Sequence, residues 1–353
     1  MGNDREDRLR NINSATLKPI VSSALGNDAI EVTEWNCVAL KGGYGEGSSI
    51  YRFHGTGLDE GHELTWSLIL KVLQRGDRVD DPSHYRYWKR EYLVFESGLL
   101  DRVTGNLHTP KCLGISEPSD DECWIWLEDI ANDVGPIWPL SQFGPVARHL
   151  GQFNGAYLSG EPMPSEPWLS VGWLRELISN SESGIDLLRD SLTHPLVSRW
   201  YTETVARDTI RLWEEREMYL DALDHLPQTF CHRDANWRNL FYRKSSKGKA
   251  KTIAVDWQET GQGAIGEEIV GLTCSSIVFE QIDVAQAPRL DRIVFENYLL
   301  GLRDAGWQGD FRIVRFGFAA ASALHYSFKA LKFLLETVLD EKKHHTWCRC
   351  PHC

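Results

Sequence analysis

The chain has 353 residues, of which 42% are hydrophobic and 25% are charged. Such values are typical of a folded protein with two domains or one large two-lobed unit. Acidic residues exceed basic ones, 50 to 38, for a net charge of −12, which argues against nucleic-acid binding and would suit a cationic ligand. An ordinary solvated acidic surface is the alternative. The longest apolar stretches are too short to span a membrane and the start is too charged for a secretory signal, so we expect a cytoplasmic protein.

The first part of the chain changes from a polar leader to strands. Residues 1–34 predict a leader with one short helix that ends near Gly26, and strands follow at 35–40 and 50–53. Between these strands lies a loop whose glycines let the backbone approach phosphate oxygens closely. The loop residues that we expect at the phosphates are Gly42, Gly43, Gly45, Gly47, Ser48 and Ser49.

Two common phosphate-binding motifs do not fit this loop. A Walker A loop needs a lysine before the serine, and a dinucleotide fingerprint needs a helix after the glycines, where this chain has a strand. What remains is a glycine-rich hairpin that covers phosphates, or a glycine-rich hairpin without a ligand.

A lysine and a glutamate follow in an order that suggests an ion pair. Lys71 lies within the apolar strand 64–73, where a lysine is costly to bury unless it is paired. Apolar residues in 83–100 recur every three or four positions and predict a helix, with Glu91 at the border of its apolar face. Glu91 can therefore reach Lys71 while Lys71 grips nucleotide phosphates. The alternatives are a snorkelling lysine and a solvated glutamate.

The pattern after residue 100 divides into a short strand region and a long helical region. Strands are predicted at Cys112–Ser116 and Cys123–Leu127, which completes a five-stranded region. Residues 143–158 form a strong amphipathic helix. Further helices are predicted at about 171–192, 196–224, 267–282, 288–306 and 312–338.

The stretch 230–257 carries the chemistry. Two strands, 240–243 and 250–257, joined by the polar turn 244–249, predict a hairpin that brings Asp234, Asn239 and Asp256 to one sheet edge. Two carboxylates and an amide can hold hard divalent cations and accept a proton from a hydroxyl. Phosphoryl transfer requires those groups, because it depends mainly on positioning and charge neutralisation.

His232-Arg233-Asp234, four spacers and Asn239, followed by Asp256-Trp257, resembles the catalytic and metal-binding loops of the protein-kinase-like fold. The sequence is most similar to the aminoglycoside phosphotransferase and choline kinase family, in which Asp-Trp replaces Asp-Phe-Gly. The resemblance covers about residues 35–275. It implies an α+β, two-lobed fold with a small antiparallel β-sheet lobe at 35–131 that binds nucleotide. A mainly helical lobe at 132–353 would carry the catalytic loop and the acceptor site.

The resemblance also implies roles for individual residues. Asp234 would be the catalytic base, Asn239 and Asp256 would hold Mg²⁺, and Lys71 would bind the phosphates of ATP or GTP while Glu91 holds Lys71. The connector through Glu128 and Ile130 would contact the nucleotide base through backbone groups. The acceptor would be a hydroxyl of a small molecule, with an amino sugar or a choline-like amine suited to the acidic chain. No nucleic acid or membrane is expected as a partner, and the protein would be a monomer or homodimer.

Some features depart from the family pattern. Glu268 stands where relatives carry an aspartate that anchors the catalytic loop, and Asn236 stands where a histidine is frequent. Glu280, Asp283, His325 and Tyr326 are acceptor-site candidates by chain position only. The terminal residues 344–353, rich in cysteine and histidine, fit either a zinc site or a frayed tail.

Two other functions stay open at this point. One is a catalytically silent kinase-like module that binds nucleotide, which the presence of all five expected polar residues disfavours. The other is an atypical protein kinase, which the short segment after Asp256 and the absence of an Ala-Pro-Glu stop disfavour.

Overall fold

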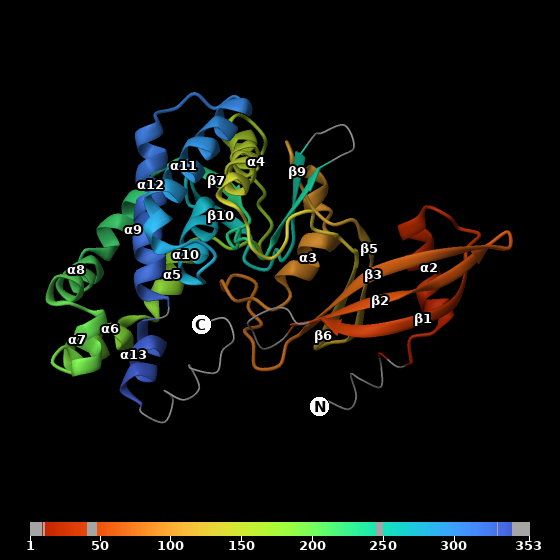
Figure 1. The fold of residues 1–353 in the computed structure, drawn as a ribbon, viewed down its shortest axis with the longest axis horizontal. Helices are drawn as coiled ribbons and strands as arrows, with labels where there is room; N and C mark the ends of the chain where they lie inside the picture. The colour runs from red at the N-terminus through yellow and green to blue at the C-terminus, as the bar shows by residue number, and fades with distance from the viewer. Residues whose placement is uncertain (1–8, 10, 41–47, 245–249, 330, 341–353) are drawn as a thin grey trace. The chain divides into compact units, whose positions relative to one another are not determined.

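The computed structural model describes residues 9, 11–40, 48–244, 250–329 and 331–340 (Figure 1). These residues divide into two compact units. Unit 1 contains the described residues up to 102 together with 109–131, and unit 2 contains 103–108 and the described residues from 132 onward.

Unit 1 is built on a five-stranded antiparallel sheet with the strand order β1-β2-β3-β6-β5. Its elements are α2 (Ser14–Leu25), β1 (Glu31–Leu40), β2 (Ser48–Asp59), β3 (His62–Gln74), α3 (Arg90–Glu96), the 3₁₀ turn η1 (Leu99–Arg102), β5 (Cys112–Ser119) and β6 (Glu122–Glu128). The expected helix near Gly26 is confirmed as α2, which ends at Gly26 in a left-handed conformation. The five predicted strands are confirmed as well.

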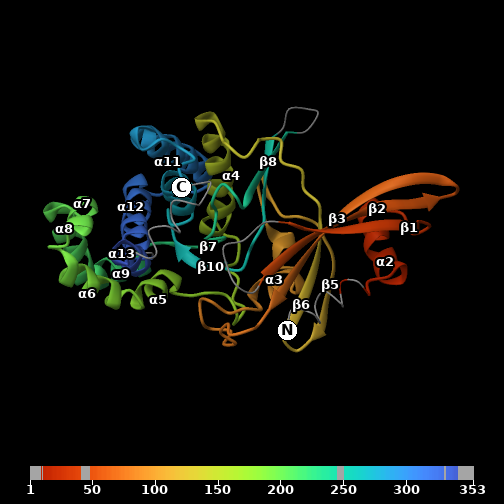
Figure 2. The same ribbon diagram turned by 60° about the horizontal axis from the view of Figure 1, so that its bottom comes forward.

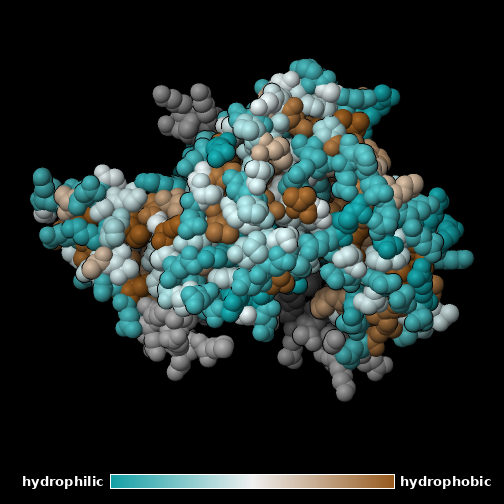
Figure 3. Space-filling view, turned by 180° about the vertical axis from the view of Figure 1, so that it is seen from behind, coloured by the Kyte–Doolittle hydropathy of each residue, from teal (hydrophilic) through white to brown (hydrophobic). Residues whose placement is uncertain are grey.

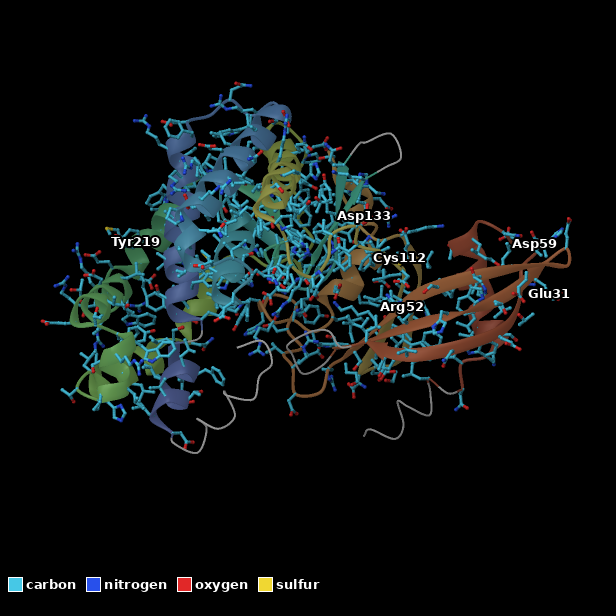
Figure 4. All side chains as sticks on the ribbon, in the orientation of Figure 1. Glu31, Arg52, Asp59, Cys112, Asp133 and Tyr219 are labelled. Carbon is cyan, nitrogen blue, oxygen red and sulfur yellow. The ribbon has the colours of Figure 1, made fainter. Side chains whose placement is uncertain are left out.

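The side chains of β3 alternate between the two faces of the sheet. Leu68, Leu70 and Val72 join the apolar cluster that α2 covers with Leu17 and Val21. Lys71 therefore points to the opposite face. Figure 1 shows α2 against β1–β3, and Glu31 and Asp59 lie at the same end of the β1–β2 pair (Figure 4).

The helix predicted at 83–100 is shorter than expected, because α3 begins only at Arg90. The preceding residues fold as turns, in which the Trp88 indole donates to Asp80 at 2.7 Å. The buried Arg90 guanidinium donates to the carbonyls of Tyr85 and His84, each at 2.7 Å. The side chain of Arg90 thus satisfies carbonyls that a continuous helix would have used itself.

Unit 2 is mainly helical. Its helices are α4 (Leu140–Leu158), α5 (Trp173–Ser179), α6 (Glu182–Ser191), α7 (Pro195–Trp200), α8 (Glu203–Glu214), α9 (Arg216–Asp224), α10 (Ser276–Val278), α11 (Ala287–Asp304), α12 (Phe311–Phe328) and α13 (Leu331–Leu339), with the π-helix η2 (Gly271–Ser275) and the 3₁₀ turn η3 (Val284–Gln286). Helices α6, α7, α8 and α13 gather together within the unit (Figure 2). The segments predicted as single helices at 171–192 and 196–224 are each divided by turns.

Unit 2 also contains two small β-sheets. Strands β7 (Gln228–Cys231) and β10 (Gly261–Ala264) pair antiparallel. Strands β8 (Leu240–Lys244) and β9 (Ala250–Ala254) form the predicted hairpin, and β4 (Leu107–His108) pairs with β9 in parallel. The hairpin is confirmed, although β9 ends at Ala254 rather than Trp257.

Helices α4 and α11 form the closest helix pair of unit 2, side by side in Figure 1. A Cβ atom at Gly301 would lie 2.0 Å from the Arg148 carbonyl oxygen, and one at Gly151 would lie 2.2 Å from the Tyr298 carbonyl oxygen. The two backbones therefore approach only because both positions are glycine. On its other side α4 packs against β7.

No helix among the described residues is long and apolar enough to cross a membrane. On the face in Figure 3 the described residues are mostly hydrophilic, and hydrophobic residues are scattered over it.

Candidate active site

Lys71 and Glu91 form a buried ion pair in unit 1. The side chains are 7% and 1% exposed. β3 and α3 supply one residue each. Because an isolated buried charge is costly, the pair fixes the ammonium group of Lys71 at one position on the sheet face opposite α2. Sequence and structure agree on this contact.

The other residues that the sequence predicted to bind the nucleotide lie at several places in unit 1. Ser48 and Ser49 begin β2, whereas Gly42, Gly43, Gly45 and Gly47 lie outside the described residues. Glu128 ends β6 and its N–H donates to the Lys111 carbonyl at 3.0 Å, while Ile130 is buried.

Between Glu128 and Ile130, the connector is tied to the sheet. Asp129 accepts hydrogen bonds from the Arg52 guanidinium at 2.8 and 3.0 Å, and Ser67 donates to the same carboxylate. Arg52 is labelled in Figure 4. The bidentate contact fixes the position of the backbone on either side of Asp129.

In unit 2, the loop after β7 carries Asp234. His232 is buried, and its Nε2 lies 2.9 Å from the Val255 carbonyl oxygen, which joins this loop to the residue before Asp256. The His232 ring also contacts the edge of the fully buried Trp257 ring, at 4.5 Å between centroids. His232 thus braces the loop.

Arg233 and Asp256 have φ angles of 69° and 68°. This left-handed conformation is uncommon for residues other than glycine and persists only where the surroundings impose it. Arg233 immediately precedes Asp234, so both carboxylates of the predicted site are positioned by strained backbone. Such strain is concentrated at functional sites.

Asp234 accepts two side-chain hydrogen bonds. Asn236 Nδ2 donates to Oδ1 at 2.9 Å and Asn239 Nδ2 donates to Oδ2 at 2.7 Å. Despite these bonds, burial raises the pKa of Asp234 to about 6, and the neighbouring Asp256 carboxylate adds to the increase. A carboxylate fixed in orientation and with a pKa close to neutrality is well suited to accept a proton from a hydroxyl.

Asn239 and Asp256 supply oxygens that could hold a cation. Because Asn239 donates through Nδ2 to Asp234, its Oδ1 is directed away from that carboxylate and can serve as a ligand. The Asp256 carboxylate is near enough to influence the pKa of Asp234. In the described part of the chain, no three His, Cys, Asp or Glu side chains surround one metal position. An amide and a carboxylate fit Mg²⁺, which takes its remaining ligands from water and phosphate.

Glu268 anchors the loop from behind. Its buried carboxylate accepts from the backbone N–H of His232 at 2.8 Å and of Arg233 at 3.3 Å. Asn154 Nδ2 on α4 lies 3.4 Å from the same carboxylate, and burial raises the pKa of Glu268. Glu268, which is one methylene longer than the aspartate of the family pattern, therefore reaches the loop amides. The sequence alone had left open whether it could do so.

Arg233 turns into the unit and away from solvent. Its side chain is 3% exposed, pairs with Glu267 at 3.4 Å and lies over the Trp173 ring. Arg233 is therefore not a simple exposed residue of the loop. His325 is also buried, 5.0 Å from Trp173 between ring centroids, and burial lowers its pKa well below the usual value.

The sequence missed several residues that complete the site. Asn236 was noted only as a departure from a family pattern, yet it bonds Asp234. Asn154 donates to the Phe230 carbonyl at 2.8 Å and accepts from the Tyr298 hydroxyl at 2.8 Å. A polar residue on the apolar face of the helix predicted at 143–158 was the available signal for Asn154. Asp283, a candidate by position, caps η3 instead.

No protein-family model and no curated protein matches the sequence, but solved structures are similar. Amicoumacin kinase, solved in complex with AMP-PNP, Ca²⁺ and Ami, aligns at a TM-score of 0.52 and 14% identity, over 98% of this chain and 93% of that one. Choline kinase from Cryptosporidium parvum Iowa II aligns at a TM-score of 0.51 and 14% identity, over 93% and 85%. This chain has a kinase-like fold. The α+β, two-lobed architecture expected from the sequence is thereby confirmed.

A further alignment, at a TM-score of 0.43 and 14% identity, is with an aminoglycoside phosphotransferase from Streptomyces rimosus, over 89% of this chain and 99% of that one. The first two alignments are sufficient to show the kinase-like fold. At these identities the similarity extends to the fold and not to the substrate.

Proposed function

We propose that this protein transfers the γ-phosphoryl group of ATP or GTP to a hydroxyl group of a small molecule. The observation that carries the proposal is the setting of Asp234, held by Asn236 and Asn239 and raised in pKa beside Asp256. The kinase-like fold agrees with it, and the amicoumacin kinase structure of that fold contains AMP-PNP.

In this reaction, Asp234 would orient the acceptor hydroxyl and accept its proton as the oxygen attacks the γ-phosphorus. The bond from that phosphorus to the β–γ bridging oxygen breaks, and the nucleoside diphosphate leaves. Asn239 Oδ1 and the Asp256 carboxylate would hold Mg²⁺, which would neutralise negative charge on the phosphates. Glu268 and His232 act only through the backbone that carries Asp234.

Unit 1 would bind the nucleotide. The ammonium group of Lys71 would contact the phosphates, and the ion pair with Glu91 would keep that group in place. The loop 42–49 would cover the phosphates, and the backbone around Glu128 and Ile130 would contact the base.

A small acceptor is favoured over a protein substrate by the length of chain after Asp256. The strand β10 begins at Gly261, and the π-helix η2 already begins at Gly271. Gly261–Ala264 pair with β7 and are therefore committed to the core of unit 2. They leave no segment for docking a peptide.

The test is nucleotide consumption with Mg²⁺ and a panel of hydroxyl acceptors, comparing the wild type with Asp234→Asn. We expect acceptor-dependent turnover in the wild type and none in the variant, while both bind nucleotide. Nucleotide binding without turnover on any acceptor would indicate a silent module, and phosphorylation of proteins in a lysate would indicate a protein kinase. Equal turnover by the variant would remove Asp234 from its role.

A further inference from the structure

A small cavity in unit 2 is lined in part by the residue that precedes Asp234. The side chains around it come from α5, α12 and the loops after β7 and β10, and they include Trp173, Arg233, Glu267 and His325. Its volume is about 10 Å³, measured as the space for the centre of a water-sized sphere. One water molecule needs about 10–15 Å³ by this measure, so an organic ligand does not fit.

The indole ring of Trp173 brings Arg233 and His325 to the same place. The guanidinium carbon of Arg233 lies 5.4 Å from the centroid of this ring, and the centroid of the His325 ring lies 5.0 Å from it. The Arg233 side chain is 3% exposed, and His325 is 7% exposed. Two polar side chains from distant parts of the sequence therefore share one buried space that is closed to bulk solvent.

Each of these two side chains has a buried nitrogen atom that lacks a hydrogen bond. Arg233 Nη1 donates to the Glu267 carboxylate at 3.4 Å. By contrast, Arg233 Nε and His325 Nε2 have no hydrogen-bond partner within the described part of the chain. Buried polar atoms are costly to leave unbonded, and in folded proteins nearly all of them bond to protein or to ordered water. The two nitrogen atoms therefore point to a ligand in the cavity that both of them line.

The surroundings require this ligand to be neutral as well as small. The Glu267 carboxylate already offsets the charge of Arg233 and would repel an anion. Burial lowers the pKa of His325 well below its usual value, so the imidazole carries no charge. Other walls of the cavity, among them Leu174 and Val270, are apolar. A neutral molecule of this size that can both donate and accept hydrogen bonds is water.

We propose that one water molecule binds in this cavity and links Arg233 Nε to His325 Nε2, and that His325 thereby positions the residue before Asp234. The water accepts a hydrogen bond from the Nε–H group of Arg233. It bonds to His325 Nε2 as donor or acceptor according to the tautomer of the ring. The Glu267 carboxylate, which lines the same cavity, is available as a third partner, and three partners are typical of a buried water molecule.

The link matters for Asp234 because the backbone of Arg233 is strained. Its φ angle is 69°, a conformation that persists only where the surroundings impose it. Glu268 holds the backbone of Arg233 by accepting from its N–H at 3.3 Å, and the bound water would hold the side chain against α12. His325 is then a positioning residue, which acts on Asp234 through the water and Arg233. The water site is independent of the proposed phosphotransferase function, whereas the effect on catalysis rests on it.

A high-resolution crystal structure of the full chain tests the water site directly. We expect one ordered water molecule within hydrogen-bond distance of both Arg233 Nε and His325 Nε2. A cavity without solvent density would overturn the inference. A direct contact between the two side chains, with no room left for water, would overturn it as well.

The positioning role is tested with His325→Leu, His325→Gln and the control Phe328→Leu. Phe328 is also buried on α12, but it contacts Trp213 at 5.4 Å between ring centroids and does not line the cavity. We expect kcat to fall about tenfold in His325→Leu, the equivalent of about one lost hydrogen bond, while the affinity for nucleotide stays the same. His325→Gln keeps a polar group and should keep kcat close to the wild-type value. Phe328→Leu should lower the melting temperature and leave kcat unchanged.

The possible outcomes separate this inference from the proposed function. Equal kcat values for His325→Leu and His325→Gln, or an equal fall in Phe328→Leu, would reduce His325 to a structural role and overturn the positioning. An absence of turnover on every acceptor would overturn the proposed function instead, and the crystal structure would still decide the water site.

Hydrogen exchange provides a measurement that does not depend on turnover. The Arg233 amide, which donates to Glu268, should exchange several-fold faster in His325→Leu relative to the amides of β7. His325→Gln and Phe328→Leu should leave this ratio at the wild-type value. An unchanged ratio in His325→Leu would show that α12 does not restrain the loop through His325, which would overturn the positioning role.

Discussion

The substitution Asp234→Asn should abolish phosphoryl transfer and also stabilise unit 2 at neutral pH. The pKa of Asp234 rises from an ordinary 3.8 to about 6 on folding. An acid with a raised folded pKa binds its proton more tightly when folded, so its ionisation destabilises the fold. Stability is therefore lost as the pH rises from about 4 to 6, and the cost stays constant above that range.

The magnitude follows from the shift. Two pKa units correspond to about 3 kcal/mol at pH 8, and about half of that cost is present at pH 5. Asparagine removes the cost but cannot accept both hydrogen bonds from Asn236 and Asn239, which loses about 1 kcal/mol at every pH. The net gain should be about 2 kcal/mol at pH 8 and about 0.5 kcal/mol at pH 5.

The assay is urea unfolding at both pH values without Mg²⁺ and nucleotide, with hydrogen exchange of the β7 amides as the report on unit 2. Asp304→Asn is the control, and its effect on stability should have the opposite sign, since a hydrogen bond from Arg148 lowers the pKa of Asp304. That variant should lose stability at pH 8 and lose less as the pH falls. If Asp234→Asn gains no more at pH 8 than at pH 5, Asp234 ionises freely, and the argument for a tuned base is refuted.

Three further substitutions test the framework around the site. Lys71→Met should weaken nucleotide binding at least tenfold and destabilise unit 1 by about 3 kcal/mol, because Glu91 loses its buried cation. Calorimetric titration measures the affinity, and urea unfolding measures the stability. An unchanged affinity for nucleotide would contradict the proposed role of Lys71 at the phosphates. Glu268→Leu should cost about 2–5 kcal/mol in urea unfolding, since two loop amides lose their acceptor. Gly301→Ala should lower the melting temperature by several degrees, because the new methyl group would clash with the Arg148 carbonyl oxygen. An unchanged melting temperature would show that α4 and α11 can move apart without loss of stability.

Sequence reasoning succeeded where the signal is local. The spacing of Asp234, Asn239 and Asp256 and the strands around them predicted the hairpin, and hydrogen bonding between Asp234 and Asn239 agrees with it. The alternation of β3 placed Lys71 on one sheet face, where a buried lysine needed a carboxylate partner. These features depend on residues close in sequence or on rules that hold for any strand.

Local reasoning failed where a distant residue decides the outcome. The helix expected at 83–100 is shortened because Arg90 satisfies loop carbonyls, a contact that periodicity cannot show. Arg233 could not be assigned because Glu267 and Trp173, which hold it, are identified only by folding.

The amino-acid sequence by itself carried the motif by which the chain resembles kinase-like proteins, and that resemblance implied both the two-lobed architecture and the groups that would carry the chemistry. Only the tertiary structure decided the pKa values and the contacts of those groups. The pKa of Asp234 depends on burial and on Asp256, and the contact of the Glu268 carboxylate with the His232 amide joins residues that are brought together only by folding. Electrostatic interaction depends on distance in space, and the fold alone sets that distance.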